Sequence, residues 1–319
     1  MIQVDSKDQL ETAFSTLIEN NILSAPVFDQ ASSKYLGFLD VRDLVAFAVF
    51  AAKENATAQS LADIVLHGKK MHSKTQDAIT VSCKPTDTFS CHLFTIFPQG
   101  FPPFGSVFVS HSSPLPRSVD LCRRNPFKPV TGDATLMEVC KILSTGTHRV
   151  PVVDGEGNVT NIISQSSVIS YLLNNSNNDA NLLKSVSELH LGTAPVLTVV
   201  DSDSAFSAFT KLDSSARSGL GVVDHSGALI ANTSGSDIKL FLLHHESLKQ
   251  PIIEFLNKIR RLDLNTRAPI FTCKQEDTAL KVIAKLSATK AHRIFIVDDD
   301  DKPVRVVSLT DVIRLVLKE

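Results

Sequence analysis

Tryptophan is absent from this 319-residue sequence and tyrosine occurs only twice, so aromatic stacking must depend on its 18 phenylalanines. The longest uncharged apolar run, Leu44–Ala52, is nine residues long, whereas a membrane-spanning helix needs about 20. The first residues also lack the basic start and apolar stretch of a secretory signal. We therefore expect a protein without a membrane-spanning segment, located in the cytoplasm or in the nucleus.

Neither sign of charge dominates, since 32 Lys and Arg residues face 34 Asp and Glu residues. Nucleic-acid binding depends on clustered Lys and Arg, so we expect no nucleic-acid partner, although a few cations could hold a small anion. The five cysteines are odd in number and form no CxxC pair, which is typical of free thiols in a reducing compartment. No metal-ligand spacing, phosphate-binding loop or nucleophile motif is present, so we expect neither a metal nor catalysis.

What the sequence does contain is a fourfold internal repeat. Four short apolar strands each end in an aspartate, which opens a polar turn before a second apolar strand and a helix start. These aspartates are Asp29, Asp154, Asp224 and Asp298. A fixed position at the helix start follows after 14 residues in the first repeat and after 13 in the others, and it holds Asp43, Ser167, Asp237 and Asp311.

An amphipathic helix precedes each unit, as in the first repeat, where Leu10, Phe14 and Leu17 share one face. Each unit is then strand, helix, strand, strand, helix, and one such unit cannot close a core alone. The predicted fold class is α/β, with four repeats in two tandem pairs. The predicted repeats span residues 1–55, 125–174, 193–244 and 267–319, and an Asn- and Ser-rich linker joins the pairs at 174–181.

Residues 56–124 do not follow the repeat and form an insertion or linker. The stretch 95–104 combines proline and phenylalanine at a density that excludes a regular helix. Two interpretations remain open: a long loop packed on the core, or a patch that docks a partner.

The repeat resembles the CBS domain, named after cystathionine beta-synthase, in two tandem pairs. The strands that begin at His148-Arg149 and His292-Arg293 are similar to those of the gamma subunit of AMP-activated and sucrose-non-fermenting-type protein kinases. Val307–Asp311 is similar to the last ribose-binding turn of that subunit, and Asn125–Val130 to the start of its second repeat. The resemblance implies a disc-like arrangement of the four repeats. It also implies a non-catalytic sensor of AMP, ADP or ATP, whose partners are the catalytic subunit and the scaffold (beta) subunit of a protein kinase.

The acids at the helix starts are candidates for binding the ribose, because one carboxylate can accept both protons of the cis-diol. The resemblance gives this role to Asp43, Asp237 and Asp311. The alternative is an acid that only stabilises the helix N-terminus, by less than about 1 kcal/mol. Repeat two has Ser167 instead, a poorer acceptor, so we expect a weak or empty site there.

Two His-Arg pairs are candidates for binding phosphate, since arginine offers a rigid fork of donors and histidine adds one more. They are His148 and Arg149 in repeat two, and His292 and Arg293 in repeat four. The alternative is a set of ordinary ion pairs. Hydroxyl groups could add donors, although Ser and Thr at helix starts are usually caps; the candidates are Ser164, Ser234, Ser308 and Thr310.

Several positions depart from the family pattern. Repeat one has Ser24 where family members often carry a cation, and Asp40 replaces a hydroxyl in its turn. Repeat two has Gln165-Ser166-Ser167 in place of basic residues, and repeat three has Gly235 in place of lysine, with Arg217 out of register. The main hypothesis is therefore a nucleotide sensor. The alternatives are an interaction scaffold with degenerate clefts and, least supported, a remote enzyme.

Overall fold

The structure is a computed structural model that describes residues 2–54 except residue 9, together with 122, 125–175, 180–238, 245–262 and 270–317. The predicted insertion or linker at 56–124, with its Pro- and Phe-rich stretch, lies outside the described residues apart from Cys122.

Each repeat contributes the predicted order of elements. Repeat one consists of β1 (Val4–Asp5), α1 (Leu10–Glu19), β2 (Ser24–Asp29), β3 (Lys34–Asp40) and α2 (Val41–Glu54). Repeat two consists of β4 (Val130–Thr131), α5 (Leu136–Ser144), β5 (Arg149–Val153), β6 (Val159–Ser164) and α6 (Gln165–Asn175). Repeat three consists of β7 (Thr198–Val200), α7 (Ala205–Ser214), β8 (Gly219–Val223), β9 (Leu229–Ser234) and the single turn η2 (Gly235–Asp237). Repeat four consists of β10 (Thr272–Cys273), α10 (Ala279–Thr289), β11 (Arg293–Val297), β12 (Pro303–Ser308) and α11 (Leu309–Leu317). Within the described ranges, three further elements connect repeats: η1 (Ala180–Leu183), η3 (His245–Lys249) and α9 (Ile252–Leu262).

All four sheets have the same topology. The first strand pairs in parallel with the second, and the second pairs antiparallel with the third. The repeated aspartate closes the turn between the last two strands: Oδ1 of Asp154 accepts the N–H groups of Glu156 and Asn158. Asp224 and Asp298 bind their own turns in the same way, each through N–H groups two and four residues further on. A short side chain that captures nearby backbone groups explains why the residue recurs at this point.

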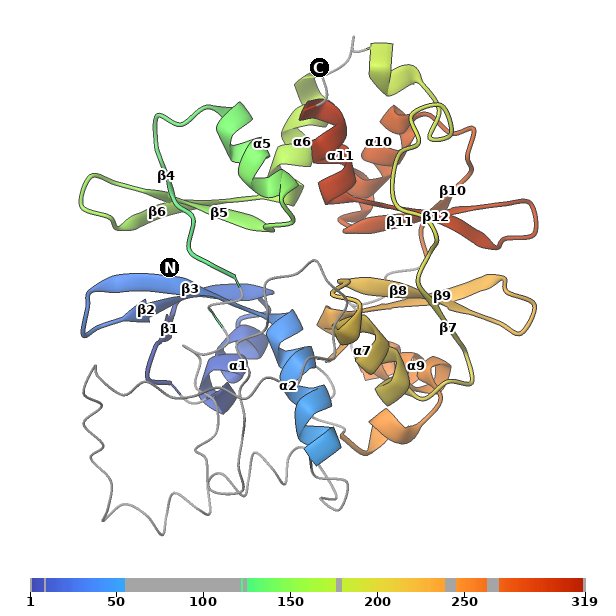
Figure 1. Cartoon of the computed structure of the whole chain (residues 1–319), viewed down its shortest axis with the longest axis horizontal. Coiled ribbons are helices and arrows are strands. Elements are labelled where there is room, and N and C mark those ends of the chain that lie inside the picture. The colour runs from blue at the N-terminus through green and yellow to red at the C-terminus, as the bar shows by residue number, and fades with distance from the viewer. Residues whose placement is uncertain are drawn as a thin grey trace, which may run out of the picture.

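The sheets of each tandem pair face each other, and the helices lie outside them (Figure 1). In the pair formed by repeats one and two, the ring of Phe127 stacks on Tyr35, with centroids 4.8 Å apart. In the other pair, Val223 and Leu229 of repeat three pack with Phe295 and Val297 of repeat four. The two tandem pairs predicted from the sequence are therefore present as sheet-on-sheet units.

The two largest apolar cores do not follow the tandem pairs. One core joins the helices and strands of repeats one and three, where α2 packs on α7, and the other joins repeats two and four, where α11 packs on α5 and α6. These helices are apolar on one stripe, which packs against a helix of the other tandem pair, as α6 also does against α10. All four repeats consequently meet at the centre, and their helix starts are held near one another (Figure 1).

Details of the helix faces differ from the expectation in repeat two. Val139, Cys140 and Leu143 are buried as the periodicity predicts, but Leu136 on the same predicted face is 38% exposed. Leu136 is the first residue of α5, beyond the edge of the apolar contact.

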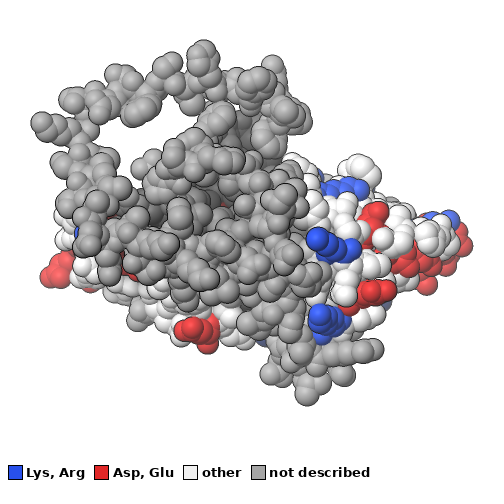
Figure 2. Space-filling model, turned by 90° about the horizontal axis from the view of Figure 1, so that it is seen from below, with Lys and Arg blue, Asp and Glu red and all other residues white. Residues whose placement is uncertain are grey.

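No helix in the described ranges combines the length and apolarity needed to cross a bilayer. On the face shown in Figure 2, acidic and basic side chains of described residues are interspersed.

Candidate functional site

The four residues at the repeated helix-start position occupy the same place in the structure. Each stands third in its helix or helical turn and accepts the backbone N–H of the residue three positions earlier. Asp43 accepts from Asp40 at 2.8 Å, Asp237 from Ser234 at 2.7 Å, and Asp311 from Ser308 at 2.8 Å. Ser167 accepts from Ser164 at 3.0 Å through its hydroxyl. This is the capping interaction of a helix N-terminus, so the repeat spacing reflects local capping in every repeat.

Capping uses one carboxylate oxygen, Oδ2, of each acid. The carboxylates do not point into bulk water, because Asp43 is only 1% exposed and Asp237 and Asp311 are half-buried. Burial raises the pKa of Asp237, against the lowering effect of its hydrogen bonds with Ser234 and Thr233. Helix capping by itself therefore accounts for the positions of these acids, and their role in binding ribose stays a prediction.

The two His-Arg pairs converge at the centre of the molecule. Desolvation lowers the pKa of His148 to about 4, helped by the positive charges of Arg42 and Arg149 and opposed by Asp40. Its Nδ1 lies 3.8 Å from Oδ2 of Asp40. Desolvation also lowers the pKa of His292, and the nearby charges of Arg293 and Arg149 add to this effect. At neutral pH the centre thus combines neutral imidazoles with charged guanidinium groups.

Each arginine of these pairs crosses to the other repeat of its tandem pair. Nη1 of Arg149 donates to Oγ of Ser24 at 2.7 Å, while Nη2 of Arg293 donates to the carbonyl and the hydroxyl of Ser218 at 2.9 and 3.0 Å. Burial lowers the pKa of Arg293 to about 10, so it stays charged at neutral pH, and its Nη1 is buried without a hydrogen-bond partner.

The arginine of repeat four fits because the facing residue is a glycine. An ideal Cβ built on Gly219 would lie 1.0 Å from Nη1 of Arg293. Gly219 occupies the same place in its strand as Ser24 in repeat one, opposite the helix start. The two repeats that lack a cation at this place therefore receive the arginine of the neighbouring repeat.

The four candidate hydroxyl groups are engaged within the protein. Ser308 donates to Asp311 at 2.6 Å, and the hydroxyl groups of Ser164 and Ser234 contact Ser167 and Ser236. Thr310 accepts from the amide of Gln165 in repeat two at 2.8 Å. These residues act as caps or as contacts between repeats, and phosphate would have to compete for them.

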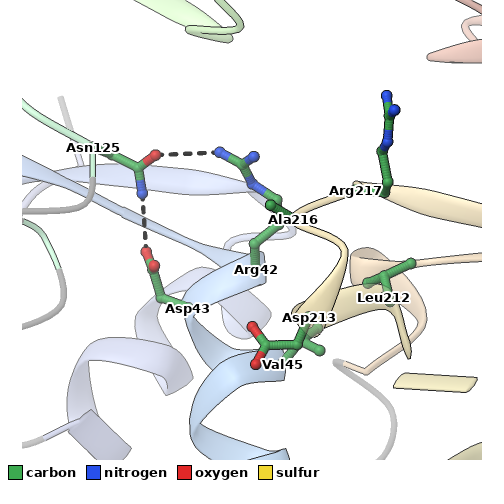
Figure 3. A pocket seen from close by; sticks show the side chains of 8 residues that line it. All are labelled: Arg42, Asp43, Val45, Asn125, Leu212, Asp213, Ala216 and Arg217. Carbon is green, nitrogen blue, oxygen red and sulfur yellow. Dashed lines mark hydrogen bonds between the residues drawn. The ribbon is translucent and has the colours of Figure 1, made fainter. Parts of the chain in front are cut away.

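A cavity of about 130 Å³ lies between α2 and α7, where repeats one and three meet (Figure 3). Its charged lining consists of Arg42, Asp43, Asp213 and Arg217. Arg217, the cation of repeat three that is out of register in the sequence, thus lines the same cavity as Asp43 of repeat one. The described residues contain no cluster of His, Cys, Asp and Glu that could hold a metal.

Sequence reasoning did not single out Arg42 or Asn125 as site residues. Arg42 lies beside Asp43 and packs against repeat three, where its Cγ is 3.4 Å from the ideal Cβ position of Gly235. Its side chain therefore lies beside the position in repeat three where the family often carries a lysine. The basic residue between two acids in Asp40–Asp43 was the signal that could have found it. Asn125 opens the segment that resembles the start of the second repeat of the gamma subunit, but no sequence signal gave its side chain a role, because that side chain contacts Arg42 and Asp43, which are more than 80 residues away in the chain.

Comparison with known proteins identifies the repeat. Residues 119–174 and 259–318, which cover repeats two and four, match the family model of the CBS domain. These two segments of the chain are CBS domains. Repeats one and three share the sheet topology of the matched repeats, so the predicted four-repeat α/β fold is confirmed.

The chain has relatives along most of its length. It is 27% identical to Protein SDS23 of Eremothecium gossypii, over 96% of this chain and 59% of the relative, and 26% identical to Protein SDS23 of Candida albicans, over 93% and 46%. The chain thus spans about half the length of these curated relatives. Among solved structures, protein MJ1225 of Methanocaldococcus jannaschii, described as a candidate archaeal homologue of g-AMPK, has a TM-score of 0.66 at 14% identity, covering 98% of this chain and 95% of that one. An uncharacterized conserved protein of Pyrococcus horikoshii has a TM-score of 0.51 at 12% identity, over 99% and 95%.

Proposed function

We propose that this protein is a non-catalytic regulatory module that binds an adenine nucleotide between its CBS repeats. The observation that carries the proposal is the convergence of the pairs His148-Arg149 and His292-Arg293 at the centre. Guanidinium groups that face a common centre suit an anion, because each one offers a fork of donors to phosphate oxygens.

The phosphate would bind at this centre and the sugar at a helix start. Arg149 and Arg293 would donate to phosphate oxygens, and the ring of His148, whose side chain is 34% exposed, would add a donor through one nitrogen. Asp311 would accept from the ribose hydroxyls, since hydrogen bonds from Ser308 occupy only its Oδ2. Repeat four is the favoured site because it carries both the His-Arg pair and the acid.

Regulation would follow from the position of the ligand at the joint of all four repeats. A ligand shifts a protein between two states only when it binds them unequally. A nucleotide that contacts Arg149 and Arg293 would compete with their bonds to Ser24 and Ser218 and so loosen the contacts within both tandem pairs. The partner in this proposal is a serine/threonine protein kinase with its scaffold subunit, and its support is the resemblance to the gamma subunit. Co-purification of the tagged chain with a kinase, in an amount that changes with nucleotide, tests the partner.

The test of binding is thermal unfolding of the whole chain with AMP, ADP, ATP or S-adenosylmethionine. A ligand at 100 times its dissociation constant adds about 2.7 kcal/mol to the free energy of unfolding, so at least one adenine nucleotide should raise the melting temperature. Isothermal titration calorimetry then gives the affinity and the number of sites. No shift with any of the four ligands at millimolar concentration overturns the proposal.

The second candidate is an interaction scaffold whose clefts hold no nucleotide. It is favoured by the contacts that the binding groups already make: Arg149 with Ser24, Arg293 with Ser218 and Thr310 with Gln165. Under this alternative the Arg149→Gln variant loses stability, while none of the four ligands changes the melting temperature of the unmodified chain.

A further inference from the structure

Asn125 bridges the acid and the base of the repeat-one site. Its Oδ1 accepts from Nη2 of Arg42 at 3.2 Å, and its Nδ2 donates to Oδ2 of Asp43 at 3.2 Å (Figure 3). The amide can adopt only this orientation, because a guanidinium only donates and a carboxylate only accepts. Asn125 thus offers a donor to the carboxylate, as a ribose hydroxyl would, and an acceptor to the guanidinium, as a phosphate oxygen would.

The backbone holds Asn125 firmly in this place. Its carbonyl accepts from the N–H of Phe38 at 2.8 Å, and its N–H donates to the carbonyl of Cys122 at 3.0 Å. The close approach depends on Gly37, because an ideal Cβ there would lie 2.2 Å from the carbonyl oxygen of Cys122 and 2.8 Å from that of Asn125. These backbone contacts with Gly37 and Phe38 of β3 therefore fix the position of the Asn125 side chain.

Repeat four lacks such a bridge among the described residues, where the hydrogen bonds onto the carboxylate of Asp311 come from Ser308 alone. Asp43, in contrast, is reached by an amide from the segment that leads into repeat two. The two acids have the same capping role and differ in this second contact.

We propose that Asn125 is the specificity-determining residue of the repeat-one cavity, which it keeps closed to nucleotides. This inference rests on the proposed function. With Asn125 in place the cavity measures about 130 Å³, below the roughly 300–1,000 Å³ of pockets that hold drug-sized ligands. Withdrawal of its amide removes one hydrogen bond from Arg42 and one from Asp43, while the ion pair of Arg42 with Asp40 and the cap formed by Asp43 remain, and it extends the cavity toward the segment at Asn125.

The charges that line the cavity define the class of ligand. The charged residues that line it are Arg42, Arg217, Asp43 and Asp213, and the side chain of Arg217 extends away from the two carboxylates (Figure 3). The formal charges cancel, so a simple polyanion gains little there. A ligand that carries both hydroxyl groups and one phosphate, such as a nucleoside monophosphate, satisfies both kinds of group.

The test compares AMP binding by the unmodified chain and by Asn125→Ala in isothermal titration calorimetry. We expect the variant to gain one AMP site or to bind AMP about tenfold more tightly, as loss of an internal competitor predicts. Asn125→Ser, whose short side chain cannot bridge both groups, should behave alike and serves if the alanine variant is unstable. Asn161→Ala, on an exposed part of β6, is the matched control and should change nothing.

The double variant Asn125→Ala with Asp43→Asn should lose the gain, which assigns the new site to repeat one. If the unmodified chain binds AMP and both Asn125 variants bind it equally, the role of Asn125 is overturned and the proposed function stands. If only the variants bind AMP, Asn125 is confirmed as the closing residue and the unmodified chain is no AMP sensor. If none of these proteins binds AMP, the role of Asn125 is overturned, and the proposed function is decided separately by thermal unfolding with all four ligands.

Discussion

Arg149 of repeat two donates a hydrogen bond to the hydroxyl of Ser24 in repeat one, with 2.7 Å between Nη1 and Oγ. Arg293 of repeat four reaches Ser218 of repeat three in the corresponding way. In both tandem pairs the arginine comes from the second repeat and the acceptor from the first. Repeats one and three lack a cation of their own at this place. In each of them, an arginine from the other repeat of the tandem pair reaches the position instead.

A double-mutant cycle measures the interaction energy between Arg149 and Ser24. Ser24→Ala should lower the free energy of unfolding by about 1.5–3 kcal/mol, because hydrogen bonds to charged groups contribute that much. In the Arg149→Gln background the same change should cost clearly less, and chemical denaturation of the four proteins gives the coupling energy. Ser207→Ala, at an exposed position of α7, is the control and should stay within about 0.5 kcal/mol. Equal costs of Ser24→Ala in both backgrounds would show that the two residues do not interact.

Gly219→Ala should disturb the second tandem pair. The added Cβ would lie 1.0 Å from Nη1 of Arg293, so the guanidinium must leave its place, at a cost of about 1–3 kcal/mol for such overpacking. Gly155→Ala is the matched control, because nothing lies within 4 Å of its ideal Cβ. Thermal unfolding should show a lower melting temperature for the first variant only, and identical melting temperatures would mean that Arg293 moves without cost.

His148 should make the stability depend on pH. Desolvation lowers its pKa in the folded protein to about 4, from 6.5 in the unfolded chain. Between these values the unfolded chain binds more protons than the folded one, so stability falls as the pH drops from about 6.5 toward 4. His148→Gln should reduce this loss in melting curves recorded from pH 7 to pH 5. His225→Gln, at a side chain that is 80% exposed, should leave the pH dependence as it is, and an unchanged dependence in His148→Gln would contradict the prediction.

Asp311→Asn should separate capping from ribose binding. The amide oxygen can still accept the N–H of Ser308, so the melting temperature should change little, within about 1 kcal/mol of stability. The amide nitrogen cannot accept a hydroxyl proton, so AMP affinity should fall about tenfold or more in calorimetry. Ser167→Ala in repeat two is the control and should retain AMP binding. Undiminished affinity in Asp311→Asn would remove repeat four as the site.

Much of the fold was predictable because its determinants are local in the sequence. The aspartate turns and the capped helix starts depend on groups two to four residues apart, as in the bonds of Asp154 to its turn and of Asp311 to Ser308. The same locality explains the ambiguity of Asp43, Asp237 and Asp311, since a cap and a ribose-binding acid require the same residue at the same spacing.

The contacts that define the candidate site join residues far apart in the chain. Arg149 meets Ser24, Arg293 passes over Gly219, and Asn125 bridges Arg42 and Asp43. No periodicity or fixed spacing in the sequence predicts any of these contacts. Gly219 matters because it has no side chain, which leaves room for the guanidinium of Arg293.

The sequence by itself determined the order of strands and helices, their division into four CBS repeats and the chemistry available at each helix start, because hydrophobic periodicity and capping act within a few residues. Only the tertiary structure decided that the largest cores run between the tandem pairs, and which arginine and which amide reach each acid. Those outcomes depend on how four similar units pack together, and packing is set by the shapes of surfaces that are distant in sequence and meet only when the chain is folded.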